Sequence, residues 1–320
     1  MNIHYYVIIN SNAASGQGMI TGNELLSLME EKRLKVTSFF TQYAGQEVQI
    51  AKKLATETLM PWDEKQEYQE FPLLVVVGGD GTLNQVLNAL NDFPTNIPLA
   101  FIPGGSGNDF ARAVGITRGN TKKALEQIIK AVKPQAINTL QYTEKNTGKK
   151  GALVNSLGIG IDASVVYATN DSTTKAALNK YHLGSLAYIF SVIKVLFTQK
   201  TFEVTIEANG QSKTYDKMFL ATTTNHRYFG GGVAIAPKAN PRVEDMHLVL
   251  AQKKSWLRLF SIILALTKEK HIAKEDVHHY VADKIVLKTK GEQYAQVDGE
   301  VLDKQEFDLE FQAKMRLFWF

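Results

Sequence analysis

The stretch Leu73–Asn84, which reads LLVVVGGDGTLN, constrains the fold of this chain more than any other. Its branched apolar run, bounded by glycine, is typical of a buried strand in a parallel sheet. Glycines directly after such a strand let a ligand approach the backbone, and the N-terminus of the following helix favours phosphate. Asp80 in this turn is a carboxylate where a metal ion that bridges phosphates would need oxygen. The stretch therefore predicts a phosphate-binding turn or, alternatively, an ordinary strand-to-helix turn capped by Asp80.

Strand-like and helix-like segments alternate over the first 135 residues. This order predicts an α/β fold with a doubly wound parallel sheet, in which ligands bind at the carboxyl ends of the strands. Three loops rich in small residues fall at such ends, at 10–18, 78–82 and 103–108. The expected strands are His4–Ile9, Leu34–Phe40, Leu73–Val77 and Ile97–Ile102, and the expected helices are Glu24–Lys32, Glu47–Thr56, Leu83–Leu90, one from Asp109, and Lys122–Val132.

Beyond about residue 135 the segments become short, strand-like and separated by turn residues, which favours a mostly antiparallel β-sandwich as a second domain. We therefore expect a nucleotide domain at 1–135 and a β-rich domain at 136–311, and we allow a tail of about 312–320 to return to the first domain. Two helices are expected within the second domain, Thr174–Phe197 and one from Ser255, its N-cap, to about Lys268.

The charge and the cysteine content of the chain bear on its cellular compartment and on the partners that it can bind. The net charge of +4 and the pI near 8.9 are mild, and they favour anionic partners such as nucleotides or acidic lipid surfaces. The chain of 320 residues has no Cys, which fits a reducing compartment, and its start lacks the pattern of a signal peptide. We expect a cytoplasmic protein with at most peripheral membrane contact and no nucleic-acid partner, and we leave a homodimer open.

The loop at Pro103–Arg112, PGGSGNDFAR, carries more information than the first. Its glycines, including Gly107, together with Ser106 and Asn108, offer donors to phosphate, and Asp109 adds a second carboxylate before a helix. Neither loop has the Walker or the dinucleotide spacing of glycines. Tight packing explains one such loop, but it explains poorly two loops at consecutive strand ends, each with an Asp.

These two loops, together with Val297–Glu300 (VDGE), resemble the catalytic domain of the diacylglycerol kinase and sphingosine kinase family, most closely the soluble bacterial lipid kinases. The resemblance extends along nearly the whole chain. Further matching segments are Asn10–Gly18, Thr41–Gly45, Asn155–Ala163 (NSLGIGIDA) and Gly230–Pro237 (GGGVAIAP).

The resemblance implies an ATP- and Mg²⁺-dependent lipid kinase. It assigns Asp80 to the organisation of Mg²⁺ and Glu300 to acceptance of the proton of the lipid hydroxyl. Asp109 is expected in the active site, although a positioning role or a helix N-cap is also open. Taken alone, 298–300 would more often be a hairpin turn. The positions matched to ATP binding are Asn10, Gly16, Thr41, Gly78, Gly79, Gly81, Thr82 and Ser106, and the loop adds Gly107 and Asn108.

Two departures from the family are visible. An Asp-Asp-Gly turn that helps to bind a structural magnesium in some members is replaced by Arg242-Val243-Glu244, and a common acidic residue is replaced by Asn138. Two rival functions stay open. One is an NAD kinase, which also carries GGDGT, and the other, suggested by these departures together with Ala14 in the first loop, is a non-catalytic lipid- or nucleotide-binding regulator. The two second-domain helices are the expected lipid-facing elements, with simple packing against the domain as the alternative.

Overall fold

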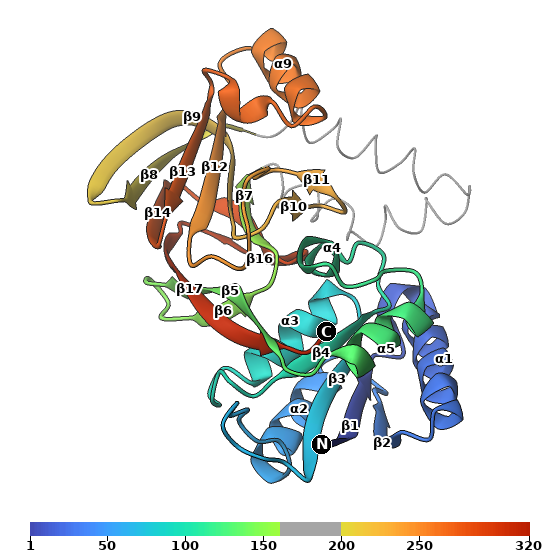
Figure 1. Ribbon diagram of the computed structural model, residues 1–320. Coiled ribbons are helices and arrows are strands. Elements are labelled where there is room, and N and C mark those ends of the chain that lie inside the picture. The colour runs from blue at the N-terminus through green and yellow to red at the C-terminus, as the bar shows by residue number, and fades with distance from the viewer. Residues whose placement is uncertain (161–199) are drawn as a thin grey trace.

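The computed structural model describes residues 1–160 and 200–320, so the helix expected at 174–197 lies outside the described residues. Figure 1 shows two domains, with the termini of the chain both at the first. The elements of the first domain are β1 (Asn2–Ile9), α1 (Gln17–Glu31), β2 (Lys35–Phe40), α2 (Gln46–Glu57), β3 (Glu70–Gly78), α3 (Asp80–Ala89), β4 (Leu99–Pro103), α4 (Asp109–Val114) and α5 (Thr121–Lys130).

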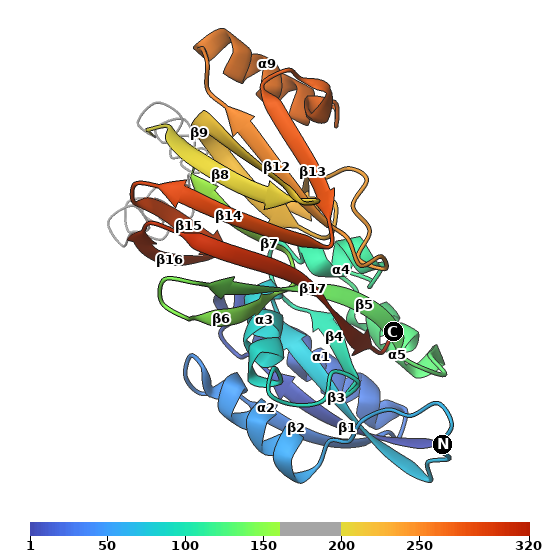
Figure 2. The same cartoon turned by 90° about the vertical axis from the view of Figure 1, so that its left-hand side faces the viewer.

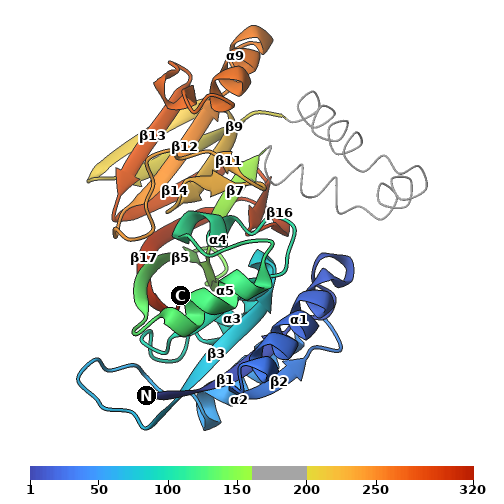
Figure 3. The same cartoon turned by 45° about the vertical axis from the view of Figure 1, so that its right-hand side comes forward.

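The strands of the first domain run parallel in the order β4-β3-β1-β2. Leu74 and Val76 of β3 pack with α2 and α3 on one face of the sheet. Val75 and Val77 pack with α1 and α5 on the other face (Figures 2 and 3). Because helices cover both faces, the strand is buried along almost its whole length. The predicted doubly wound α/β domain is confirmed.

The chain changes direction in the sheet at β1, since β2 lies on one side of it and β3 on the other. Such a switch point leaves a crevice between the carboxyl ends of the two strands, where ligands of doubly wound proteins bind. The loops after β1 and β3 both open into it. The fold alone therefore locates the candidate site at this edge.

The second domain is a mostly antiparallel β-sandwich, as predicted (Figure 2). Buried side chains from most of its strands form one hydrophobic core, whose members extend in sequence from Leu140 to Phe311. Its described elements are β5 (Gln135–Glu144), β6 (Lys150–Leu153), β7 (Ser156–Gly160), β8 (Phe202–Ala208), β9 (Gln211–Thr224), β10 (Tyr228–Phe229), β11 (Val233–Ala234), β12 (Met246–Gln252), α9 (Trp256–Leu266), β13 (Val277–Ala282), β14 (Lys284–Lys290), β15 (Gln293–Val297), β16 (Glu300–Gln305) and β17 (Asp308–Phe318).

Strand β17 joins the two domains into one sheet. It pairs antiparallel with β5 and β14, and Phe318 at its end pairs in parallel with Leu99 of β4. Trp319 is fully buried in the first domain, and its Nε1 donates to the carbonyl of Ile128 at 3.1 Å. The end of the chain thus ties the two domains together.

Several boundaries differ from those expected. Helix α1 begins at Gln17, not at 24, because Gly16 with φ of 99° lets the chain turn directly into the helix. Strands β5, β10, β11, β13 and β16 lie outside the strand-like segments that the sequence predicts beyond residue 135. His278 and His279, which show no metal-ligand spacing and are predicted from sequence to be surface residues, are half-buried on β13. Helix α9 does begin after Ser255, whose Oγ accepts from the backbone of Arg258 at 3.3 Å, and it ends at Leu266.

Candidate active site

The loop after β1 is tied to the two neighbouring strand ends. Asn10 donates from Nδ2 to Oγ1 of Thr82 at the start of α3 over 2.8 Å. Thr41, which follows β2, accepts at Oγ1 from the backbone N–H of Ser11 at 3.3 Å. Gly18 is needed here as well, because an added Cβ would lie 2.1 Å from the carbonyl oxygen of Asn10. Three of the predicted positions, on three strand ends, are thus held together.

The glycine loops after β3 and β4 touch. The N–H of Gly104 donates to the carbonyl of Gly78 at 2.7 Å. A Cβ added to Gly105 would lie only 2.5 Å from Cα of Gly79. This approach requires glycine at position 105, and it places the backbones of both loops at one edge, where phosphate could be held.

The tip of the second loop is shaped by Asn108, which has a left-handed φ of 52°. Its side chain closes the loop on Gly105, accepting from the N–H at 3.2 Å and donating to the carbonyl at 2.7 Å. Asn108 is therefore buried and structural, whereas Ser106 is exposed at the tip. Gly107 lies beside Asp80, since an added Cβ would be in van der Waals contact with Oδ2 of Asp80 at 3.7 Å.

Asp80 faces the N-terminus of α4. Its Oδ2 accepts from the N–H of Asp109 at 2.9 Å, and its Oδ1 accepts from the N–H of Phe110 at 3.3 Å. Burial raises the pKa of Asp80 despite these two donors, and the charge of Asp109 raises it further. Asp80 forms no ion pair with any described residue, so its charge is available to a cation.

Asp109 connects the first domain to the second. Its Oδ1 pairs with Arg112 at 3.1 Å, and its Oδ2 accepts from the N–H of Gly231 at 2.7 Å. Gly231 belongs to the glycine run 230–232 between β10 and β11. The side chain of Asp109 is nearly fully buried, and its charge is already matched by Arg112. Its geometry fits a positioning role.

Segments of both domains enclose a small cavity of about 170 Å³ beside these carboxylates. It is lined by Asp80, Gly107, Asp109, Asn155, Ser156, Phe229, Gly230, Gly231, Gln296, Asp298 and Gly299. The sequence segments around 80, 107, 155, 230 and 298 therefore converge at one place, as the family resemblance implied.

Asp298 was not among the predicted site residues, yet it fastens the two domains. Its Oδ1 accepts from the N–H groups of Asn155 and Ser156. Its Oδ2 accepts from the N–H of Val154 at 2.8 Å and from Nδ2 of Asn84 at 2.7 Å. Burial raises the pKa of Asp298 to about 7, against N–H donors that favour the ionised form. The N–H donors to its carboxylate come from segments 142 to 214 residues away, so no local sequence pattern indicates this role.

Asp298 and Gly299 also form a tight turn between β15 and β16, with positive φ at both residues. The hairpin turn expected for this segment taken alone is thus present. The turn delivers Glu300 to the start of α3. Oε1 of Glu300 accepts from Nε2 of Gln85 at 3.0 Å and lies 3.9 Å from where a Cβ of Gly81 would stand.

Glu300 is exposed, and it borders a second, larger cavity of about 660 Å³ between the domains. Helices α2 and α3 form one wall of this cavity, and β6, β15 and β16 form the other. Its lining combines apolar side chains such as Val301 and Leu302 with the polar residues Asn84, Gln85, Lys52, Lys149 and Lys150. Glu300 thus follows the turn that lines the small cavity with Asp80, and it borders a larger space that could hold part of a second substrate.

The turn at 242–244, where the family has Asp-Asp-Gly, does not fit a structural metal. Arg242 donates from Nη2 to the carbonyl of Val114 and to Oε1 of Gln135, each at 3.2 Å. A guanidinium therefore occupies this loop, while Asn138 donates its backbone N–H to the carbonyl of Pro241 at 2.7 Å. Within residues 1–160 and 200–320, no three His, Cys, Asp or Glu side chains form a group that could hold a metal by themselves.

A nucleotide-bound Mg²⁺ does fit the donors present. Mg²⁺ usually keeps several waters and takes one or two carboxylates together with substrate phosphates. Asp80, buried beside a second carboxylate and without a cationic partner among the described residues, is the protein oxygen that such an ion would use. The touching glycine backbones supply the phosphate side.

The fold and the convergent carboxylates define a two-domain protein of the kinase class. The family described as diacylglycerol kinase catalytic domain matches residues 4–141, and the one described as YegS C-terminal NAD kinase beta sandwich-like domain matches residues 155–314. Residues 4–141 thus belong to the diacylglycerol kinase catalytic-domain family and residues 155–314 to the accompanying C-terminal domain family, as the sequence motifs predicted.

Named relatives agree with this assignment. The chain is 27% identical to "Putative lipid kinase YtlR" of Bacillus subtilis over 312 residues, which cover 96% of both chains. It is 27% identical to a diacylglycerol kinase of the same organism over 87% of this chain and 83% of the relative. A crystal structure of a "putative diacylglycerol kinase" from Bacillus anthracis shares the fold, with a TM-score of 0.76, 21% identity and coverage of 99% of this chain and 95% of that chain.

No helix within residues 1–160 and 200–320 is both long and apolar enough to cross a membrane.

Proposed function

We propose that this protein is an ATP- and Mg²⁺-dependent lipid kinase that converts diacylglycerol to phosphatidic acid. The observation that carries the proposal is the placement of Glu300 beside Gly81, at the start of the helix that also bears Asp80. Phosphoryl transfer depends mainly on positioning and on charge stabilisation, with a carboxylate near the attacking oxygen. Both requirements are met here by groups from different domains.

The donor side of the reaction belongs to the first domain. The loops after β3 and β4 bind the phosphates of ATP through their backbone N–H groups and are joined by the bond from Gly104 to Gly78. Asn10, Thr41 and Thr82 hold the loop after β1 beside the ends of β2 and β3. When bound, Mg²⁺ neutralises phosphate charge, and Asp80 holds it directly or through water. Asp109 keeps the glycine run of the second domain over the phosphates through its bond to Gly231.

The acceptor side belongs to the larger cavity. The lipid hydroxyl approaches Glu300 from that cavity, where Val301 and Leu302 offer apolar contact. Glu300 takes the proton of the lipid hydroxyl while the hydroxyl oxygen forms the new bond to the γ-phosphorus. The bond between the γ-phosphorus and the bridging oxygen of ADP breaks at the same time, and ADP leaves. Gln85 orients the carboxylate through its 3.0 Å hydrogen bond.

A product assay tests this proposal. Purified protein is incubated with ATP and Mg²⁺ and with mixed micelles that present diacylglycerol or other hydroxyl-bearing lipids, and a parallel reaction contains NAD instead of lipid. We expect phosphatidic acid and an equal amount of ADP, identified by mass spectrometry. Formation of NADP would instead identify an NAD kinase, and ATP binding without turnover on any lipid would identify a regulator.

A further inference from the structure

Helix α9 carries an exposed apolar face. Trp256, Leu257, Phe260 and Leu264 are 37%, 85%, 52% and 61% exposed. Phe260 lies three residues after Leu257 and four residues from both Trp256 and Leu264, so the four side chains gather on one side of the helix, and we refer to these four residues as the α9 face. The opposite side is also apolar, with Leu259, Ile262 and Ala265 buried against the sandwich. The helix is therefore apolar nearly all round, which is typical of a helix covered on both sides.

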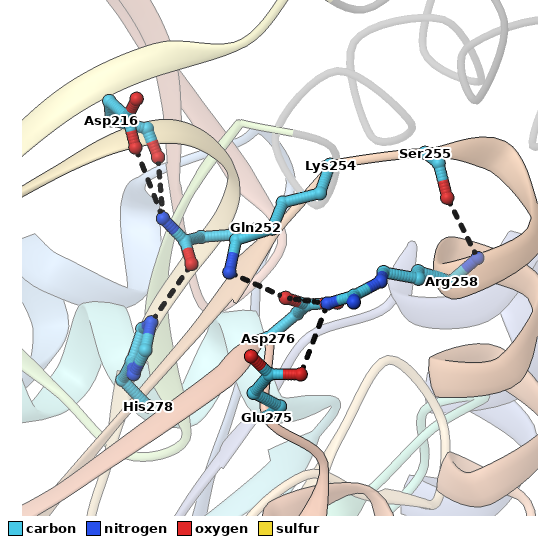
Figure 4. A network of polar contacts seen from close by, with 8 residues as sticks. All are labelled: Asp216, Gln252, Lys254, Ser255, Arg258, Glu275, Asp276 and His278. Atoms are coloured by element: carbon cyan, nitrogen blue, oxygen red, sulfur yellow. Dashed lines mark hydrogen bonds and ion pairs between the residues drawn. The ribbon is translucent and has the colours of Figure 1, made fainter.

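The single charged side chain of α9 pairs with acidic residues of the second domain (Figure 4). Arg258 is the only charged residue within α9, and its Nη1 bonds Asp276 at 3.0 Å and Glu275 at 3.2 Å. Lys254 pairs with the same buried Asp276 at 2.9 Å. A helix that faces water would show the reverse arrangement, with apolar side chains inside and charges outside. The contacts also fix the helix firmly on the sandwich.

The surroundings of the α9 face are basic. The segment 253–276 contains six Lys or Arg and three acidic residues, of which Glu275 and Asp276 pair with Arg258 and Lys254. Lys268 and Lys270 just after the helix are exposed and form no ion pair with any described residue. At the other end, Nζ of Lys253 lies 3.8 Å from the centre of the Trp256 ring. Apolar side chains including Trp, flanked by basic residues, are the pattern of an element that lies in a membrane interface.

We propose that the α9 face docks on an anionic lipid bilayer, with its four apolar side chains entering the boundary between head groups and acyl chains. The choice of a lipid surface rests on the proposed function, since a lipid kinase must work where its acceptor is dissolved. The basic residues around the helix complement acidic head groups. Helix α9 lies at the end of the second domain away from the first (Figure 1), so that docking leaves the nucleotide loops accessible to ATP.

Vesicle sedimentation tests the proposal without requiring turnover. The full-length protein is mixed with vesicles of phosphatidylcholine alone or with about a third phosphatidylglycerol, and bound protein is measured at low and high salt. We expect binding to the anionic vesicles that weakens with salt, with a blue shift of Trp256 fluorescence that the Trp256→Phe variant lacks. Leu257→Ser together with Phe260→Ser should weaken binding by on the order of 10- to 100-fold.

Val132→Ser is the matched control, because Val132 is 83% exposed on the first domain, and this variant should bind like the wild type. Melting temperatures with and without ATP show that each variant is folded, and Leu264→Ser serves if the double variant is not. Equal binding of wild type and α9 variants would overturn the proposal. So would a dimer that the variants dissociate, or protection of the α9 face by residues 161–199 in a wild type that does not bind vesicles. Vesicle binding with no kinase activity would leave docking intact and refute the proposed function instead.

Discussion

The backbone N–H of Asp109 donates a 2.9 Å hydrogen bond to Oδ2 of Asp80, although the two residues follow different strands of the sheet. The bond aims the N-terminus of α4 at the Asp80 carboxylate, while the side chain of Asp109 reaches across to Gly231 of the second domain. One carboxylate thus faces the N-terminus of α4 beside the cavity, and the other fastens the domains around it.

We expect Asp80→Asn to lower kcat by at least about a hundredfold, because it removes the charge that would hold Mg²⁺ and turns an amide towards the N–H groups of α4. The Mg²⁺ concentration for half-maximal turnover should rise as well, which a Mg²⁺ titration at saturating ATP measures. A variant with normal turnover and an unchanged Mg²⁺ requirement would remove Asp80 from the metal site.

Asp298→Asn should reduce both stability and activity. The amide that it introduces would point a donor at N–H groups that now share a carboxylate. Loss of these charge-assisted bonds costs about 2 kcal/mol or more of the free energy of unfolding, as measured in urea. Activity falls too, since the turn at 298 positions Glu300. An unfolding midpoint equal to that of the wild type would contradict the fastening role of Asp298.

The approach of the two glycine loops predicts a difference between two similar changes. Gly105→Ala places a Cβ 2.5 Å from Cα of Gly79 and should destabilise the fold by about 1–3 kcal/mol and weaken ATP binding. Gly79→Ala meets Gly105 at 3.4 Å with an ordinary φ of −91°, so its effect on stability should be smaller. Thermal unfolding of both variants makes the comparison, and equal losses would show that the loops do not pack as described.

His226 predicts a loss of stability in mild acid. The ring accepts from the N–H of Tyr228 at Nδ1, so Nε2 carries the proton and donates to Oδ1 of Asn155. Burial lowers the pKa of His226 from 6.5 to about 4. Between these values the unfolded chain binds a proton that the folded protein excludes, so the free energy of unfolding falls as the pH falls, by about 1.4 kcal/mol per pH unit. Urea unfolding of His226→Gln should show a flatter pH dependence by this amount, and an identical slope would refute the assignment.

The first domain could be largely predicted, because its apolar strands, glycine loops and helices follow local rules that act within about 15 residues. The contribution of Asp298 could not, because its partners become neighbours only after the domains close on each other. Strand β17 shows the same limit: its residues read as a short strand to Phe311 and a tail, whereas pairing with β5 extends it to Phe318. The family could be predicted from the spacing of its motifs. The sequence of α9 is apolar nearly throughout, so only the structure shows which of its side chains are buried and which are exposed.

The central claim is that Glu300 accepts the proton of the lipid hydroxyl, and the turnover of Glu300→Gln tests it most directly. Asp303→Asn is the matched control, since it makes the same change of charge at an exposed position of the same strand. Steady-state kinetics with diacylglycerol micelles should show a kcat lower by on the order of 10²- to 10⁴-fold for Glu300→Gln, with unchanged ATP binding and stability, and no loss for Asp303→Asn. A Glu300→Gln enzyme that turns over at the wild-type rate would contradict the account.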